Sequence, residues 1–258
     1  MFSWLTERRR ARLLQSPFPS SWRDVLHRNV SAYRRLDDDE QTRLRELVQV
    51  FIEEKRWEGC GGLVLTDEHR VTIAGAACLL LLGRGHDLMH DVESILVYPS
   101  TVILPPPAAS TFDGRPRVVE EGVAALGVAH RRGPVVLAWD AVVHGARNAE
   151  DGRNVVIHEM AHKIDFLDGD ADGTPPLEGR GARQQWAAVC SEAFFAVQRG
   201  ELPLLRDYAG TNEAEFFAVA SEVFFEQPEQ LARRAPALYG VLRDFYHLDL
   251  AARAAREP

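Results

Sequence analysis

Two histidines one helical turn apart, with a glutamate beside the first, form the most informative motif of the chain. They are His158 and His162, in the run His-Glu-Met-Ala-His that also contains Glu159. In an α-helix, positions i and i+4 lie on one face, so both imidazoles can bind one ion while Glu159 projects beside them. Such a pair is typical of zinc-dependent hydrolysis, in which the ion activates water and the glutamate acts as general base. The alternative is a pair of ordinary histidines on a helix surface.

A catalytic zinc site needs a third protein ligand. Asp165 is the nearest candidate because it follows His162 by three residues, but three ligands from one straight helix would crowd one side of the ion. Glu215 and Glu222 are seven residues apart in a later apolar segment, so they share one face if that segment is helical. We therefore expect the third ligand from this later segment. In a competing interpretation, Glu215 is the N3 residue of a capping box that starts at Asn212.

The histidine motif needs a helix to position it, and the sequence predicts one over about 152–167. Asp151 or Asn154 can cap the start of this helix, and Gly169 can end it. Its apolar ridge consists of Val156, Met160 and Ile164. Because such a ridge packs against the core, the histidines would lie beside a buried face.

Helical patterns also dominate the two ends of the chain. Residues 1–58 are predicted to be helical, with no strand signal. After Trp139 the pattern becomes helical again, and the predicted helices there, besides the one with the histidines, cover about 182–199, 212–226 and 236–246. Pro228 is expected to end the second of these three.

The middle of the chain predicts a small sheet. The short β-rich runs are Leu63–Leu65, 95–98 and 135–137, with a helix across 74–82 and a proline-rich surface loop at 105–116. Helices, then a small mixed sheet, then helices indicate an α+β fold. We expect a helical N-terminal region at 1–58 and a catalytic domain at 59–258, together forming one compact unit.

Composition excludes several classes of protein. Of the 258 residues, 46% are apolar and 26% are charged, which is typical of a folded globular protein. The formal net charge of −8 opposes general nucleic-acid binding. Three scattered cysteines do not make a disulfide framework, and no apolar run is long enough to span a membrane or serve as a signal peptide. We expect a cytoplasmic protein that is not associated with a membrane.

Two segments together resemble a known family. HEMAHKID and DYAGTNEAEFFAVASEVFF are similar to the Mlc titration factor A family of bacterial zinc peptidases, whose catalytic core is similar to that of the lethal factor type of protease. The segments KRWEGCGGLVLTDEHRVTIAGAACLLLLG, ILVYPS and GPVVLAW resemble the middle of that family. The resemblance therefore covers most of residues 20–247 and implies a zincin-like variant of the α+β fold.

The resemblance also implies a role for each site residue. One zinc ion per chain would be held by His158, His162 and Glu215, with Glu159 as the general base. Tyr208 would face the metal and help to stabilise the oxyanion. Glu222 would lie behind the ligands and orient one of the imidazoles.

The expected function is therefore the hydrolysis of peptide bonds by a zinc-bound water, with an aminopeptidase-like activity on short peptides suggested by the family. A second hypothesis, also from the family, is that the protein binds and sequesters a transcriptional repressor of sugar uptake, Mlc or a similar protein, and that its peptidase activity is secondary or regulated. A third is a structural zinc site, which would need a fourth protein ligand such as Asp165 or Glu222.

Overall fold

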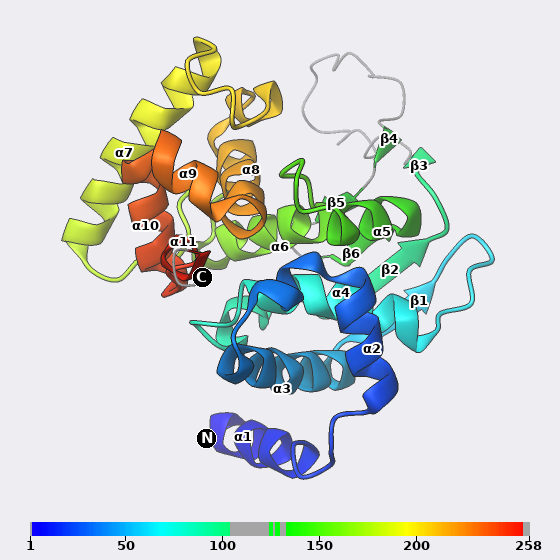
Figure 1. The fold of residues 1–258 in the computed structure, drawn as a ribbon. Helices are drawn as coiled ribbons and strands as arrows, with labels where there is room; N and C mark the ends of the chain where they lie inside the picture. Colours follow the sequence, from blue (N-terminus) through cyan, green and yellow to red (C-terminus); the bar gives the residue numbers. More distant parts are fainter. Residues whose placement is uncertain (1, 104–123, 126, 130–132, 255–258) are drawn as a thin grey trace, which may run out of the picture.

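The computed structural model describes residues 2–103, 124–125, 127–129 and 133–254. The predicted loop at 105–116 lies outside these residues. Figure 1 shows helices α1–α3 at one end of the molecule and α7–α10 at the other, with α6 between them.

The sheet beside α6 is small and mixed. Its strand order is β1 (Arg56–Gly59), β2 (Ser94–Tyr98), β6 (Val135–Ala138) and β5 (Gly127–Ala129). The first three strands are parallel, and β5 runs antiparallel to β6 at the edge of the sheet. All four residues of β6 are buried, because strands flank it on both sides and helices α5 and α6 pack against it. Two short strands, β3 (Val102–Ile103) and β4 (Ala124–Ala125), form a separate antiparallel pair.

Helices make up most of the described chain. The α-helices are α1 (Phe2–Leu13), α2 (Ser20–Asn29), α3 (Asp38–Glu54), α4 (Asp67–Leu79), α5 (Trp139–Arg147), α6 (Val155–Asp165), α7 (Arg180–Gln198), α8 (Glu213–Glu226), α9 (Pro228–Arg234), α10 (Pro236–Tyr246) and α11 (Ala251–Ala254). The 3-10 helices are η1 (Ser31–Arg35), η2 (His86–Met89), η3 (Phe166–Asp168) and η4 (Asp207–Gly210). Helices around a small mixed sheet agree with the predicted α+β class.

The first strand differs from the prediction. Leu63–Leu65 is not a strand, and β1 lies earlier, beginning at Arg56 inside the stretch predicted to be helical and ending at Gly59, one residue beyond it. Gly61 and Gly62 have positive φ angles of 60° and 82°, so the chain turns before it reaches Leu63. The signal of β1 was weak because the strand has only four residues, two of them charged and one a glycine; its Trp57 packs edge-to-face on Phe51.

Four helices also differ from the prediction. Helix α4 begins at Asp67 rather than near 74, because Thr66 and His69 form a capping box. The predicted helices did not include α5, α9 and α11. Helix α8 ends at Glu226, two residues before Pro228. Pro228 itself begins α9, where a residue without a backbone N–H loses no hydrogen bond.

One hydrophobic cluster extends through most of the fold. It includes Leu26 and Phe51 from the predicted N-terminal region and Ile95, Ile157 and Phe217 from the predicted catalytic domain. The division at 58/59 remains a prediction. Within the described part of the chain, no helix has the length and apolar character needed to cross a membrane.

Candidate metal centre

Helix α6 carries the histidine motif and is fixed at its start by Asn154. The Asn154 side-chain oxygen accepts hydrogen bonds from the backbone N–H groups of Val156 and Ile157, both at 3.2 Å. The predicted ridge of Val156, Met160 and Ile164 is fully buried. The helix packs against α8, α4, α5 and β5. Its two histidines lie on the side of α6 that faces α8.

Helix α8 brings Glu215 to the same place. The Asn212 side chain caps α8 by accepting a hydrogen bond from the Glu215 backbone N–H at 2.9 Å. Glu215 thus occupies the N3 position, as the competing interpretation proposed. Its side chain does not complete a capping box, however, because it lies against the two imidazoles of α6.

Three side-chain atoms converge at this point. The Nε2 atoms of His158 and His162 are 3.2 Å apart, and Glu215 Oε2 lies 3.1 Å from the first and 3.4 Å from the second. Ligand atoms about 2.0–2.1 Å from a tetrahedral zinc ion would be roughly 3.3–3.4 Å apart. The measured triangle is therefore close to one face of such a tetrahedron, and these residues fit a zinc-sized ion. Among the described residues, they form the one group of at least three His, Cys, Asp or Glu with this geometry.

Charge favours a cation in the same place. Burial alone would lower the pKa of His158, but contacts with Glu215 and Glu222 raise it to about 9. Burial alone would raise the pKa of Glu215, but the imidazoles more than offset this and lower it. Glu215 Oε2 is buried and accepts no hydrogen bond from any described residue. The cluster thus places the ionised carboxylate of Glu215 in a buried position between two imidazole nitrogens, a donor set that suits a divalent cation.

Glu222 lies directly behind His158. It is 1% exposed, and its Oε1 is 2.8 Å from His158 Nδ1. Its Oε2 accepts a hydrogen bond from the Asn154 backbone N–H at 2.7 Å. With a proton on Nδ1 bound to Glu222, the lone pair of His158 Nε2 points to the cluster, which is the tautomer a metal requires.

Arg206 completes this arrangement and was not singled out from the sequence. Its Nη2 donates to Glu222 Oε1 at 2.6 Å and lies 3.4 Å from His158 Nδ1. The guanidinium therefore compensates the buried charge of Glu222. The sequence signal was only a cation two residues before Tyr208, which by itself does not distinguish it from a surface arginine.

Glu159 is 5% exposed, and burial raises the pKa of its carboxyl group. The pKa also responds to His158, His162 and Glu215, so Glu159 is electrostatically coupled to the cluster. Gly127 of edge strand β5 lies against it, since a Cβ atom at this position would come within 2.6 Å of Glu159 Oε1. The sequence analysis missed Gly127, whose role depends on the pairing of β5 with β6.

Tyr208 lies in η4, on the exposed side of the cluster. Its side chain is 47% exposed, and its ring centre is 6.1 Å from that of His158. Partial burial and the charge of Glu215 raise the pKa of Tyr208 to about 12. The phenol therefore stays protonated at neutral pH and can donate a hydrogen bond.

Asp165 does not join the three converging atoms. It is fully buried, and its Oδ2 accepts a hydrogen bond from the Gly173 backbone N–H at 3.2 Å. Burial raises the pKa of this carboxyl group to about 6. Asp165 thus fixes the turn after η3, and Glu222 faces Nδ1 of His158 rather than the Nε2 side of the cluster.

Comparisons with known proteins point to one family. Residues 4–247 match the family described as glucose-regulated metallopeptidase M90. An uncharacterized protein of Synechocystis is 34% identical over 95% of this chain and 90% of its own length. Proteins named Mlc titration factor A are 33% identical in Klebsiella pneumoniae, over 90% of this chain and 87% of the relative, and in Serratia proteamaculans, over 98% and 94%.

Proposed function

The chain belongs to the glucose-regulated metallopeptidase M90 family, and from this premise we propose that it is a zinc-dependent peptidase. One zinc ion per chain would be held by His158, His162 and Glu215. The observation that carries this assignment is the triangle of 3.1–3.4 Å between their three ligand atoms. Zinc, when bound, supplies Lewis-acid activation of water and of the scissile carbonyl.

The residues around the three ligand atoms can each take a different role in catalysis. Glu159, with its raised pKa, accepts a proton from the attacking water and delivers it to the leaving amine. Tyr208 stays protonated and donates a hydrogen bond to the developing oxyanion. Glu222, compensated by Arg206, holds the ring of His158 in the required tautomer.

The sheet edge supports a peptide as the substrate. Within the described ranges, strand β5 is the outermost strand of its sheet, and Gly127 within it lies against Glu159. An extended peptide can add to such an edge by main-chain hydrogen bonds, which would bring its carbonyl groups past the general base. We further propose an aminopeptidase-like preference for short peptides. Chromogenic peptides with free and blocked N-termini, assayed with and without a chelator, test this preference, and equal cleavage of both kinds would contradict it.

Glu159→Gln tests the mechanism. Turnover should fall by about 10²–10⁴-fold because the amide cannot accept the proton, while zinc stays bound at one ion per chain. Glu213→Gln changes an exposed glutamate in the first turn of α8 and serves as a matched control with unchanged activity. Wild-type activity in the Glu159 variant would rule out its role as general base.

The names of the relatives support a second candidate function. Proteins called Mlc titration factor A share 33% identity with this chain, which favours binding and sequestration of an Mlc-like repressor of sugar uptake. The Glu159→Gln variant separates the two functions, because sequestration should survive the loss of catalysis. A repressor that is cleaved by wild type and not retained by the variant would be a substrate rather than a partner.

A further inference from the structure

One guanidinium, that of Arg206, contacts residues on both sides of the candidate metal centre. On the buried side, its Nη2 donates to Glu222 Oε1 at 2.6 Å, behind the ring of His158. On the exposed side, its Cζ lies 5.8 Å from the centre of the Tyr208 ring, which is close enough for a cation–π contact. The same side chain therefore contacts a residue that orients a ligand imidazole and the proposed donor to the oxyanion.

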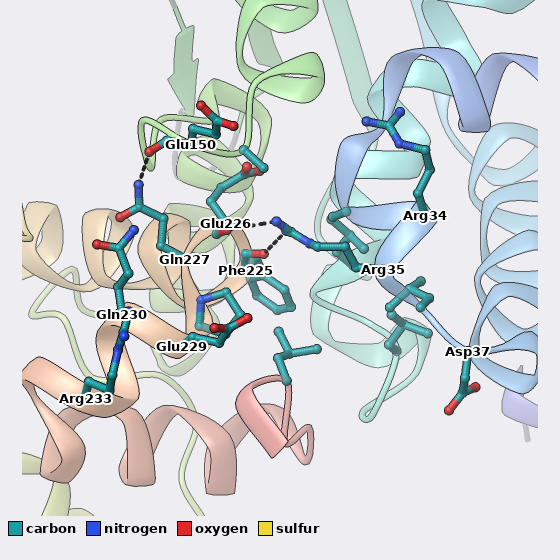
Figure 2. A pocket seen from close by; sticks show the side chains of 17 residues that line it. Arg34, Arg35, Asp37, Glu150, Phe225, Glu226, Gln227, Glu229, Gln230 and Arg233 are labelled. Atoms are coloured by element: carbon teal, nitrogen blue, oxygen red, sulfur yellow. Dashed lines mark hydrogen bonds between the residues drawn. The ribbon is translucent and has the colours of Figure 1, made fainter. Parts of the chain in front are cut away.

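The contact with Glu222 is a fixed one, because α8 is held at both ends. The Asn212 side chain caps the start of this helix. At its end, Arg35 donates to the carbonyl groups of Phe225 and Glu226 at 2.8 and 3.1 Å (Figure 2). Glu222 is 1% exposed, and within the described ranges it provides the one ion pair of the guanidinium. An anchor on this helix therefore fixes the guanidinium relative to the three ligand atoms.

The Tyr208 ring depends on neighbours outside its own element. Helix η4 has four residues, and its backbone is held at the far end by Gln198 of α7, which donates to the Gly210 carbonyl at 3.0 Å. Tyr208 is 47% exposed; its ring centre is 6.1 Å from that of His158, and Arg206 is the cation against it. The backbone bond fixes η4 but leaves the side-chain torsion angles free, so the contacts of the ring decide where the hydroxyl group points.

The hydroxyl group of Tyr208 also interacts with the carboxylate of Glu215. A hydroxyl group that donates to the oxyanion in the transition state has to leave this carboxylate, so the interaction with Glu215 cannot hold the ring during the reaction. The guanidinium of Arg206 lies over the ring and does not use the hydroxyl group. Its contact can therefore persist while the donor turns from Glu215 to the substrate.

We propose that Arg206 is a positioning residue for the hydrolysis: anchored on Glu222, it holds the Tyr208 ring where the phenol can donate to the oxyanion. This role rests on the proposed peptidase function. It needs the planar guanidinium, which can donate to a carboxylate through one nitrogen while its plane lies against an aromatic ring. A lysine ammonium is a compact charge on a flexible stem, so it can pair with Glu222 without also holding the ring.

Arg206→Lys tests this coupling by peptide hydrolysis at saturating zinc. The variant keeps a cation beside Glu222, so zinc affinity should stay within about threefold of wild type, whereas kcat should fall about tenfold with little change in KM. Arg206→Gln removes the cation and should lower both kcat and zinc affinity. Arg199→Lys changes an exposed arginine that pairs with Glu201, and it serves as the matched control with unchanged kcat and zinc affinity.

Tyr208→Phe shows whether the loss passes through the phenol. This variant alone should lower kcat about 10²–10³-fold, as is typical for the loss of one donor to an oxyanion. Arg206→Lys added to it should cost no more than about a further twofold, because a ring without a hydroxyl group has no donor to position. A further tenfold loss in the double variant, or an unchanged kcat in Arg206→Lys alone, would overturn the proposal.

Crystal structures of the zinc-loaded wild type and Arg206→Lys provide a test that does not need turnover. The Tyr208 hydroxyl group should be displaced by about 1 Å or more in the variant, while His158 and Glu215 stay in place. An unmoved phenol would overturn the role of Arg206. Failure of the wild type to hydrolyse any peptide would instead overturn the proposed peptidase function, and the position of the phenol would still decide whether Arg206 places it.

Discussion

The two ends of α8 contain the same acidic residue type in opposite electrostatic states. At the metal-facing end, the pKa of Glu215 is lowered, because two imidazoles more than offset the effect of burial. At the other end, burial raises the pKa of Glu226 to about 8. Both side chains lie on one helix, so helix propensity and sequence pattern do not explain why their pKa values shift in opposite directions. The partners that each carboxyl group has on other elements explain it.

These partners come from different parts of the chain. Glu215 and Glu222 contact imidazoles of α6, and Glu222 also has the guanidinium of Arg206. Glu226 accepts a hydrogen bond from one neutral amide, that of Asn154, and the nearby guanidinium of Arg35 lowers its pKa less than burial raises it. Carboxylates with cationic partners stay ionised and can hold a metal or orient its ligand, whereas a buried carboxyl group with a neutral donor holds its proton. The comparison predicts that the same Glu→Gln change has different consequences at the two ends.

Glu222→Gln should have the largest effect on zinc affinity. We expect zinc affinity to fall roughly 10–100-fold, because the ligand His158 loses a charged acceptor behind its ring. Competition with a chromogenic zinc chelator measures this. Glu226→Gln is the control and should leave zinc affinity unchanged. Equal losses in the two variants, one helical turn apart, would show that the contact of Glu222 with His158 does not set zinc affinity.

Glu226→Gln should instead change how stability depends on pH. Between about pH 4.5 and 8 the unfolded chain ionises Glu226 while the folded protein keeps it protonated, so wild-type stability falls as pH rises through this window. The variant lacks this decline and should gain about 3–4 kcal/mol relative to wild type between pH 5 and 8. Urea unfolding at both pH values measures the difference. A constant offset between the two proteins would contradict the raised pKa.

Asn154→Ala should have the smallest effect, although Asn154 contacts both ends. Loss of its cap on α6 should cost about 1 kcal/mol of unfolding free energy. Zinc affinity should change little, because the bond to Glu222 comes from the backbone N–H, which the variant keeps. Asn154→Ser restores a capping oxygen but not the amide bond to Glu226, so recovery of stability in this variant assigns the cost to the cap. A large loss of zinc affinity in either variant would contradict this separation.

Local patterns in the sequence predicted much of the metal-facing end. The i, i+4 spacing of His158 and His162 and the apolar ridge beneath them depend only on helix geometry, and α8 and α10 agree closely with their predicted ranges. Long-range contacts explain most of what was missed. Strand β1 depends on its parallel partner β2, Gly127 on the position of β5 beside α6, and Arg206 on a carboxylate sixteen residues away. None of these has a signature within its own segment.

The zinc content and coordination of the purified protein test the central claim most directly. Elemental analysis of gently purified protein should give one zinc ion per chain. Anomalous scattering at the zinc edge should place the ion against Nε2 of His158, Nε2 of His162 and the carboxylate of Glu215. Absence of a divalent ion, or a Glu215 side chain turned away from both imidazoles, would contradict the assignment.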